Sequence, residues 1–274
     1  MQYYAPARYC MIFVEVIMHR FFHLFSVTIP AYGLFMALGL CLGSALAIYR
    51  GKKLGVDPND TLIIAATCIC GVLLGGFGLY LFTAYGWKQL QLWILRKDFA
   101  FLTEGGLVFY GGLIGGLVFL PLGMIISGEK RLELMANAYV PAIPLGHGVG
   151  RIGCFFAGCC YGLPYDGLGA VRLADAAIPY SVFPIQLVEA VLNFSLAIVL
   201  IYLSKKRPRG LCLLCIYLLC YSMERIVLEF FRGDLIRGSA AGVSTSQWIG
   251  FILIIGALTV LGLEKRRLGT LFHG

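Results

Sequence analysis

Long apolar runs, separated by short charged segments, recur along this chain and restrict it to a small set of folds. A helix needs about 17–25 mainly apolar residues to cross the hydrocarbon of a bilayer. Of the 274 residues, 59% are hydrophobic and 13% are charged, whereas roughly 25% of the residues of a soluble domain are charged. We therefore predict an all-α membrane protein, a polytopic bundle of about seven transmembrane helices. The predicted crossings are residues 30–49, 61–84, 105–127, 134–149, 183–203, 210–231 and 247–263.

The first 29 residues differ in character from the predicted bundle. Their apolar stretch contains Glu15 and is followed by His19, Arg20 and His23, without the small-residue cleavage site of a signal peptide. We interpret residues 1–29 as an N-terminal interfacial segment that lies along the membrane surface. Residues 30–274 are then a single polytopic transmembrane domain.

Basic residues collect at one side of the predicted crossings. Twelve of the 22 lysines and arginines lie there, namely Arg50, Lys52, Lys53, Lys130, Arg131, Lys205, Lys206, Arg207, Arg209, Lys265, Arg266 and Arg267. The positive-inside rule makes these segments cytoplasmic, so we predict a cytoplasmic C-terminus and an outward-facing segment after Arg151. Membrane topology thus explains the net charge of +8, and we expect no nucleic-acid partner.

Arg151 is the residue that a purely structural reading explains least well. It follows the apolar run 138–149 and lies within a stretch of small and apolar residues, 146–162. A guanidinium keeps its charge in proteins, and at the centre of a bilayer it costs at least about 2.5–3.5 kcal/mol. A binding site for a phosphate explains such a residue. The alternative is an arginine that extends from a helix end to the lipid headgroups.

A second polar group lies in the predicted crossing 210–231. Tyr221, Arg225 and Glu229 follow one another at intervals of four residues and form one stripe on a helix, which Arg232 extends. An internal Arg225–Glu229 ion pair that joins two helices is the structural explanation. Because buried ion pairs often stabilise a fold no better than apolar residues do, the stripe favours a functional role.

Tyr110 lies between paired glycines in the sequence EGGLVFYGGLIGG, residues 104–116. Glycine lets a backbone approach a ligand or another helix closely. Taken alone, this pattern is explained at least as well by glycine-mediated helix packing as by a binding site.

Three of the ten cysteines, Cys154, Cys159 and Cys160, lie close to Arg151 in the sequence. Their spacing, C-x4-C-C, matches neither the usual metal-ligand patterns nor the C-x-x-C pattern of thiol oxidoreductases. The sequence therefore predicts neither a metal site nor a cofactor, although it leaves a redox role of these cysteines open.

Five motifs, in order along the chain, resemble those of the bacterial prolipoprotein diacylglyceryl transferases. They are IPAYGL at 29–34, EGGLVFYGGLIGG at 104–116, GRIGCFFAGCCYG at 150–162, VFPIQLVEA at 182–190 and YSMERIVLEFFR at 221–232. The resemblance implies a multi-pass enzyme of the bacterial cytoplasmic membrane. Such an enzyme transfers the sn-1,2-diacylglyceryl group of phosphatidylglycerol to the lipobox cysteine thiol of a preprolipoprotein. A thioether forms and glycerol phosphate is released. The expected partners are phosphatidylglycerol, lipobox peptides and the lipid bilayer.

The resemblance also implies roles for individual residues. Arg151 matches the arginine that binds the lipid phosphate, and Arg225 matches a second essential arginine. Tyr110 stands where the best-known members have a histidine that is often proposed as a base, and we count it with the catalytic residues. The residues expected to bind phosphatidylglycerol are Arg151, Tyr32, Gly153, Tyr221, Glu229, Arg232 and Gln186. Glu189 matches a polar residue of the same family motif as Gln186.

The chain departs from the family pattern at further positions. Cys154 stands where many members have asparagine, and Phe183 where a histidine usually precedes the proline. His147 lies four residues before Arg151 and would share a face with it on a continuing helix. We therefore consider His147 a possible base, although a histidine packed in the core is the simpler interpretation.

Other functions fit parts of the sequence. Tyr110 allows a paralogue with an altered thiol or lipid substrate. Intramembrane arginines and broken helices also suit a small-anion membrane transporter, but no repeated half supports it. A membrane thiol oxidoreductase that uses Cys159 and Cys160 is the third alternative.

Overall fold

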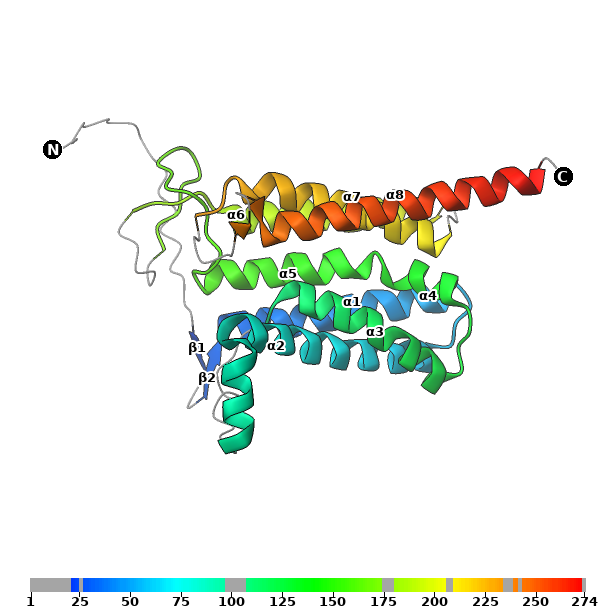
Figure 1. Cartoon of the computed structure of the whole chain (residues 1–274), viewed down its shortest axis with the longest axis horizontal. Helices are drawn as coiled ribbons and strands as arrows, with labels where there is room; N and C mark the ends of the chain where they lie inside the picture. The colour runs from blue at the N-terminus through cyan, green and yellow to red at the C-terminus, as the bar shows by residue number, and fades with distance from the viewer. Residues whose placement is uncertain are drawn as a thin grey trace. The chain divides into compact units, whose positions relative to one another are not determined.

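The computed structural model describes residues 21–24, 27–96, 107–173, 180–205, 209–233, 239–240 and 243–272. These residues form eight helices and two short antiparallel hairpins (Figure 1). The helices are α1 (Ala31–Lys53), α2 (Pro58–Arg96), α3 (Phe109–Ser127), α4 (Leu132–Tyr139), α5 (Ala142–Phe156), α6 (Ile185–Lys205), α7 (Gly210–Glu229) and α8 (Thr245–Phe272). The hairpins pair β1 (Phe21–Leu24) with β2 (Val27–Pro30) and β3 (Ser239–Ala240) with β4 (Val243–Ser244).

Six helices of the described ranges are long and apolar enough to cross a membrane: α1, α2, α3, α6, α7 and α8. The prediction of an all-α polytopic membrane protein is thus confirmed. Of the predicted interfacial segment, residues 1–20 lie outside the described residues, and its end forms the β1–β2 hairpin.

The predicted crossing 134–149 is divided into two helices. α4 ends at Tyr139 and α5 begins at Ala142, with a turn at Val140 and Pro141 between them. Pro144 lies in the first turn of α5, where a helix tolerates proline because the missing N–H has no intrahelical partner. α5 then continues to Phe156, beyond the predicted end at residue 149, so Arg151 is inside a helix.

The chain divides into two compact units. One contains Met1–Gly43 and Val140–Gly274, and the other contains Ser44–Tyr139. In the first unit α5 packs against α6, α6 against α7 and α7 against α8 (Figure 1). The start of α1 also packs closely on α5, since a Cβ added to Gly39 would come within 2.6 Å of the carbonyl oxygen of Gly146.

The second unit is built on glycine contacts between α2 and α3. A Cβ on Gly71 or Gly75 of α2 would overlap the backbone of Gly115 or Gly111 of α3. Helices of membrane proteins approach closely through such small residues. Of the glycines in the motif around Tyr110, Gly111 and Gly115 thus pack α3 against α2. Further along, α2 turns at Gly86, whose φ of 70° suits glycine, and remains helical to Arg96.

The segment that follows α5 is fixed against the ends of other elements of the first unit. Bridges of β type join Gly162 to Arg232 and Val171 to Val182. Phe155, Val171, Leu173 and Val182 form a buried apolar cluster beneath this segment. The end of α5, the beginning of α6 and the end of α7 therefore meet in one region.

Candidate active site

Arg151 lies on α5 and is buried, with 8% of its surface exposed. Glycines surround it in the sequence and leave room for neighbouring side chains: a Cβ on Gly148 would come 2.6 Å from the ring of Phe194, and one on Gly153 would come 2.7 Å from Phe35. Because a buried guanidinium keeps its charge, it requires an anionic partner nearby.

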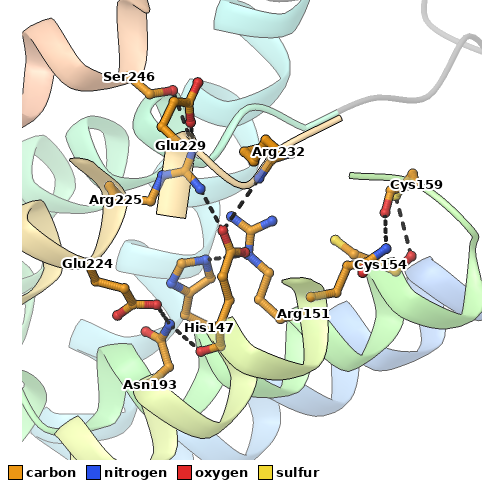
Figure 2. Close-up of polar contacts among 12 residues, drawn as sticks. His147, Arg151, Cys154, Cys159, Asn193, Glu224, Arg225, Glu229, Arg232 and Ser246 are labelled. Atoms are coloured by element: carbon orange, nitrogen blue, oxygen red, sulfur yellow. Dashed lines mark hydrogen bonds and ion pairs between the residues drawn. The ribbon is translucent and has the colours of Figure 1, made fainter. Parts of the chain in front are cut away.

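Glu189 on α6 supplies that partner for three arginines. Figure 2 shows these arginines, Arg151, Arg225 and Arg232, pointing toward one another. Its Oε2 lies 2.5 Å from Nε of Arg151, and its Oε1 lies 2.6 Å from Nη1 of Arg225 and 3.4 Å from Nη1 of Arg232. Glu189 is 1% exposed. Arginines from two distant parts of the chain therefore meet on one buried carboxylate.

Arg225 has further partners at the end of α7. Its Nη2 donates to Oε2 of Glu229 over 3.0 Å and to Oγ of Ser246 over 3.4 Å. The Arg225–Glu229 pair expected from the helical spacing is thus present. However, the shorter contact of Arg225 is to Glu189, 36 residues away in the sequence.

His147 lies one turn before Arg151 on α5, as the helical spacing predicts. Nε of Arg151 donates a hydrogen bond to Nε2 of His147 over 3.2 Å. Because this N–H points to His147, the 2.5 Å contact of Arg151 with Glu189 is an ion pair rather than a linear hydrogen bond. The His147 ring also meets Tyr221 edge-on, with ring centroids 5.4 Å apart.

The Nη groups of Arg151 form no hydrogen bond with any residue that the structure describes. A guanidinium can bind a phosphate through two parallel N–H···O bonds. Among the described residues, Arg151 is thus held through its Nε alone.

The other predicted lipid-binding residues of the first unit lie around this cluster. Tyr221 is 1% exposed and stacks on Tyr217. Tyr32 lies in the first turn of α1, and its backbone is 3.5 Å from the Cβ position of Gly153. Gln186 is 1% exposed and donates from Nε2 to the backbone oxygen of Cys159 over 2.7 Å.

Tyr110 belongs to the second unit, where it lies at the start of α3 beside Phe109. Its predicted catalytic role stays a prediction.

Two residues of this region were missed at the level of sequence. Asn193 on α6 is 0% exposed and donates from Nδ2 to Oε1 of Glu224 on α7 over 3.0 Å. Glu224 precedes Arg225 and is half-buried. A glutamate and an asparagine inside predicted crossings were the available signals. Glu189 was named only through its family motif, and its central position was not foreseen.

The three cysteines that follow Arg151 converge at the end of α5. Their sulfur atoms all lie within 4.8 Å of one another. Cys160 lies between α5 and α6, outside the predicted crossings. Hydrogen bonds with the Cys154 and Cys159 thiols, together with the charges of Arg151 and Arg232, lower the pKa of the Cys160 thiol.

Taken together, the fold and the site define a class: a multi-pass membrane protein whose buried arginines converge on one carboxylate. The family model for prolipoprotein diacylglyceryl transferase matches residues 19–263. The chain therefore belongs to the prolipoprotein diacylglyceryl transferase family, as its motifs indicated.

Individual relatives agree with this assignment. The chain is 31% identical over 245 residues to phosphatidylglycerol–prolipoprotein diacylglyceryl transferase 2 of Clostridium perfringens, a match that covers 88% of this chain and 93% of the relative. It is also 31% identical to the phosphatidylglycerol–prolipoprotein diacylglyceryl transferases of Clostridium tetani and Bordetella avium. These matches cover 90% and 86% of this chain and 97% and 90% of the relatives. Nothing in these comparisons supports the alternative of a small-anion transporter.

Proposed function

We propose that this protein transfers the diacylglyceryl group of phosphatidylglycerol to the lipobox cysteine thiol of a preprolipoprotein. The observation that carries the proposal is the convergence of Arg151 and Arg225 on Glu189, with the Nη groups of Arg151 left to bind a phosphate. Family membership and the names of the relatives support the same reaction.

In this reaction the thiol sulfur attacks the glyceryl carbon that is bonded to a phosphate oxygen. A C–S bond forms, the C–O bond breaks with its electron pair passing to the phosphate oxygen, and glycerol phosphate leaves. Negative charge grows on that oxygen in the transition state. Fixed donors aimed at such a charge in a site that excludes water are usually the largest contribution to catalysis. We assign this task to Arg151, supported by Arg225 and Arg232.

The thiol must lose its proton before or during the attack, since the thiolate is the nucleophile. Two guanidiniums beside the thiol favour its ionisation by an opposite-charge effect. His147 is the candidate acceptor for the proton, because it contacts Arg151 directly. To act as acceptor, its Nε2 must exchange the hydrogen bond from Arg151 for the proton of the thiol.

The proposed substrates and topology follow from the same assignment. Phosphatidylglycerol and the lipobox peptide approach from the outer side of the bacterial cytoplasmic membrane. The C-terminus lies in the cytoplasm, as the basic segments indicate.

The direct test uses purified protein, phosphatidylglycerol and a lipobox peptide, with mass spectrometry to detect a diacylglyceryl adduct on the peptide. A peptide with serine in place of the lipobox cysteine is the control and should stay unmodified. Arg151→Ala and Arg225→Ala should abolish the adduct while the protein stays folded. Full activity of either variant contradicts the proposed roles, and absence of the adduct with wild-type protein contradicts the proposed function.

A further inference from the structure

The thiols of Cys154, Cys159 and Cys160 form a compact cluster that the proposed reaction does not use. All three sulfurs lie within 4.8 Å of one another, and all nine described cysteines are thiols. Metal–thiolate bonds to zinc are about 2.3 Å long, so three sulfurs around one ion lie roughly 3.8–4.0 Å apart. The cluster therefore already has close to the dimensions of a three-thiolate metal site.

The backbone around the cluster is fixed on two sides. The Cys159 amide donates to the Cys154 carbonyl over 3.2 Å, and Nε2 of Gln186 donates to the Cys159 carbonyl over 2.7 Å. Metal ligands are held in position by hydrogen-bonding residues behind them. Gln186, which is 1% exposed, is such a residue for the Cys159 backbone. Cys160 has a φ of 59° and is the one non-glycine residue with positive φ among the described residues. The backbone at Cys160 thus has a conformation that is less strained for glycine than for a residue with a side chain.

The charges around the cluster suit an anionic metal complex. Three thiolates and one divalent cation carry a formal net charge of −1. Arg151 lies three residues before Cys154 on α5, and a β-type bridge joins Arg232 to Gly162, two residues after Cys160. Positively charged residues therefore adjoin the cluster. Cys159 is exposed whereas Cys154 is buried, which gives an ion a route to the ligands from one side.

We propose that Cys154, Cys159 and Cys160 bind a thiophilic d10 metal ion of the zinc type as three thiolates, with a fourth coordination position open to the thiol of the acceptor peptide. Soft thiolate ligands select such ions. Three protein ligands with one open position are the arrangement of catalytic zinc sites. This inference replaces the expectation of no metal, which rested on sequence spacing alone.

The proposed role of the open coordination position adds a step to the proposed function and depends on that function. A thiol that coordinates a metal ion is deprotonated, so the acceptor cysteine would be held as a thiolate beside Arg151. Its proton passes on binding to His147, the candidate acceptor of the proposed reaction. The sulfur then forms the C–S bond while the electron pair of the broken C–O bond passes to phosphate, and no atom changes its oxidation state.

Metal binding is tested first with wild-type protein in detergent, reduced and then loaded with Co²⁺ as a spectroscopic probe for Zn²⁺. We expect one ion per chain and a thiolate-to-cobalt charge-transfer absorption. Cys159→Ser, at an exposed position, should weaken binding at least 100-fold, and Cys160→Ser should do the same. Cys41→Ser, at an exposed position on α1, is the matched control and should bind like wild type.

The open position is tested with the same cobalt-loaded protein in the absence of lipid. Addition of a lipobox peptide should increase the charge-transfer absorption by about one further thiolate, and the serine peptide should leave it unchanged. An unchanged spectrum with the cysteine peptide overturns the open position. The metal site itself is overturned by undetectable binding to reduced wild-type protein or by equal binding in Cys159→Ser.

Activity separates this inference from the proposed function. Metal-free wild-type protein that forms the peptide adduct at the full rate overturns the role of the metal but upholds the transferase. Metal-loaded protein that binds the peptide and never forms the adduct contradicts the transferase and leaves the metal site standing.

Discussion

Arg151 on α5 and Glu189 on α6 form a buried ion pair, with Nε and Oε2 2.5 Å apart. The same carboxylate also holds Arg225 and Arg232. Three like charges in an interior that excludes water repel one another strongly, because electrostatic interactions are weakly screened there. Glu189 is therefore the residue that allows the arginines to share one site.

Replacement of this carboxylate should affect folding and catalysis together. Glu189→Gln leaves three buried guanidiniums without their common counter-charge, and breaking a buried ion pair at one partner typically costs about 3–5 kcal/mol. We expect a clear fall in the melting temperature in detergent and loss of adduct formation. A lipid that carries a phosphate should partly restore the melting temperature, because it supplies negative charge to the arginines.

Glu264→Gln is the matched control for that variant. Glu264 pairs with Arg209, whose side chain is 47% exposed. Pairs of this kind contribute about 0–1 kcal/mol, so both stability and activity should stay near wild type. Equal losses in the two variants would show that Glu189 has no special position.

Arg151→Lys should separate charge from geometry at the phosphate site. Lysine keeps the positive charge but lacks the planar fork that binds two phosphate oxygens. Loss of one positioned donor in a catalytic site lowers the rate by about 10²- to 10³-fold. We expect a decrease of that size in the initial rate of adduct formation, with an unchanged melting temperature. A rate near wild type would mean that charge alone suffices.

His147→Gln should test the candidate base. A positioned general base contributes about 10²- to 10⁴-fold to the rate, and glutamine keeps a hydrogen-bond acceptor for Nε of Arg151. If His147 accepts the proton, the variant should be slow at neutral pH and should recover part of its rate at higher pH, where more thiol is ionised. Unchanged thioether formation removes His147 from the mechanism.

The glycine contact between α2 and α3 should be sensitive to a single methyl group. Gly75→Ala places a Cβ against the backbone of Gly111, and overpacking of this kind typically costs about 1–3 kcal/mol. Gly78→Ala is the matched control on the same helix, because its Cβ would meet nothing within 4 Å. We expect a lower melting temperature for the first variant, and no decrease for the second, since alanine is the better helix former.

Acid should weaken a contact at the end of α3. Hydrogen bonds from Arg131 lower the pKa of Glu129 from 4.5 to about 2. Because the folded-state pKa is the lower one, this stabilisation is complete above the unfolded value and is lost as pH falls from about 4.5 towards about 2. The melting temperature of wild type should exceed that of Glu129→Gln near neutral pH. The difference should shrink below about pH 4, and a constant difference would contradict this assignment.

Hydropathy predicted most of the membrane fold, because the bilayer sets the length of a crossing. The exception is the region around α4 and α5. An apolar run that contains prolines does not reveal where a helix stops, and here the continuation of α5 to Phe156 depends on close packing at Gly39 and Gly153.

Most residues of the candidate site were named from the sequence, but few of the contacts between them were predicted. Local spacing was sufficient for the His147–Arg151 and Arg225–Glu229 contacts, since both follow from one turn of a helix. The central position of Glu189 depends on the packing of α5, α6 and α7, which no local pattern contains. The close approach of the three sulfur atoms was missed for the same reason: the turn at Cys160 brings together thiols whose sequence spacing is unusual.

The short length of α5 bears on how the protein reaches its membrane. Its 15 residues rise only about 22 Å, less than the hydrocarbon thickness of about 30 Å. A segment this short, with an arginine inside it, is a poor candidate for insertion by itself. We therefore expect α5 to insert into the bilayer only after α6, which carries Glu189, has been synthesised. The candidate active site and the insertion of the polypeptide would then depend on the same ion pair.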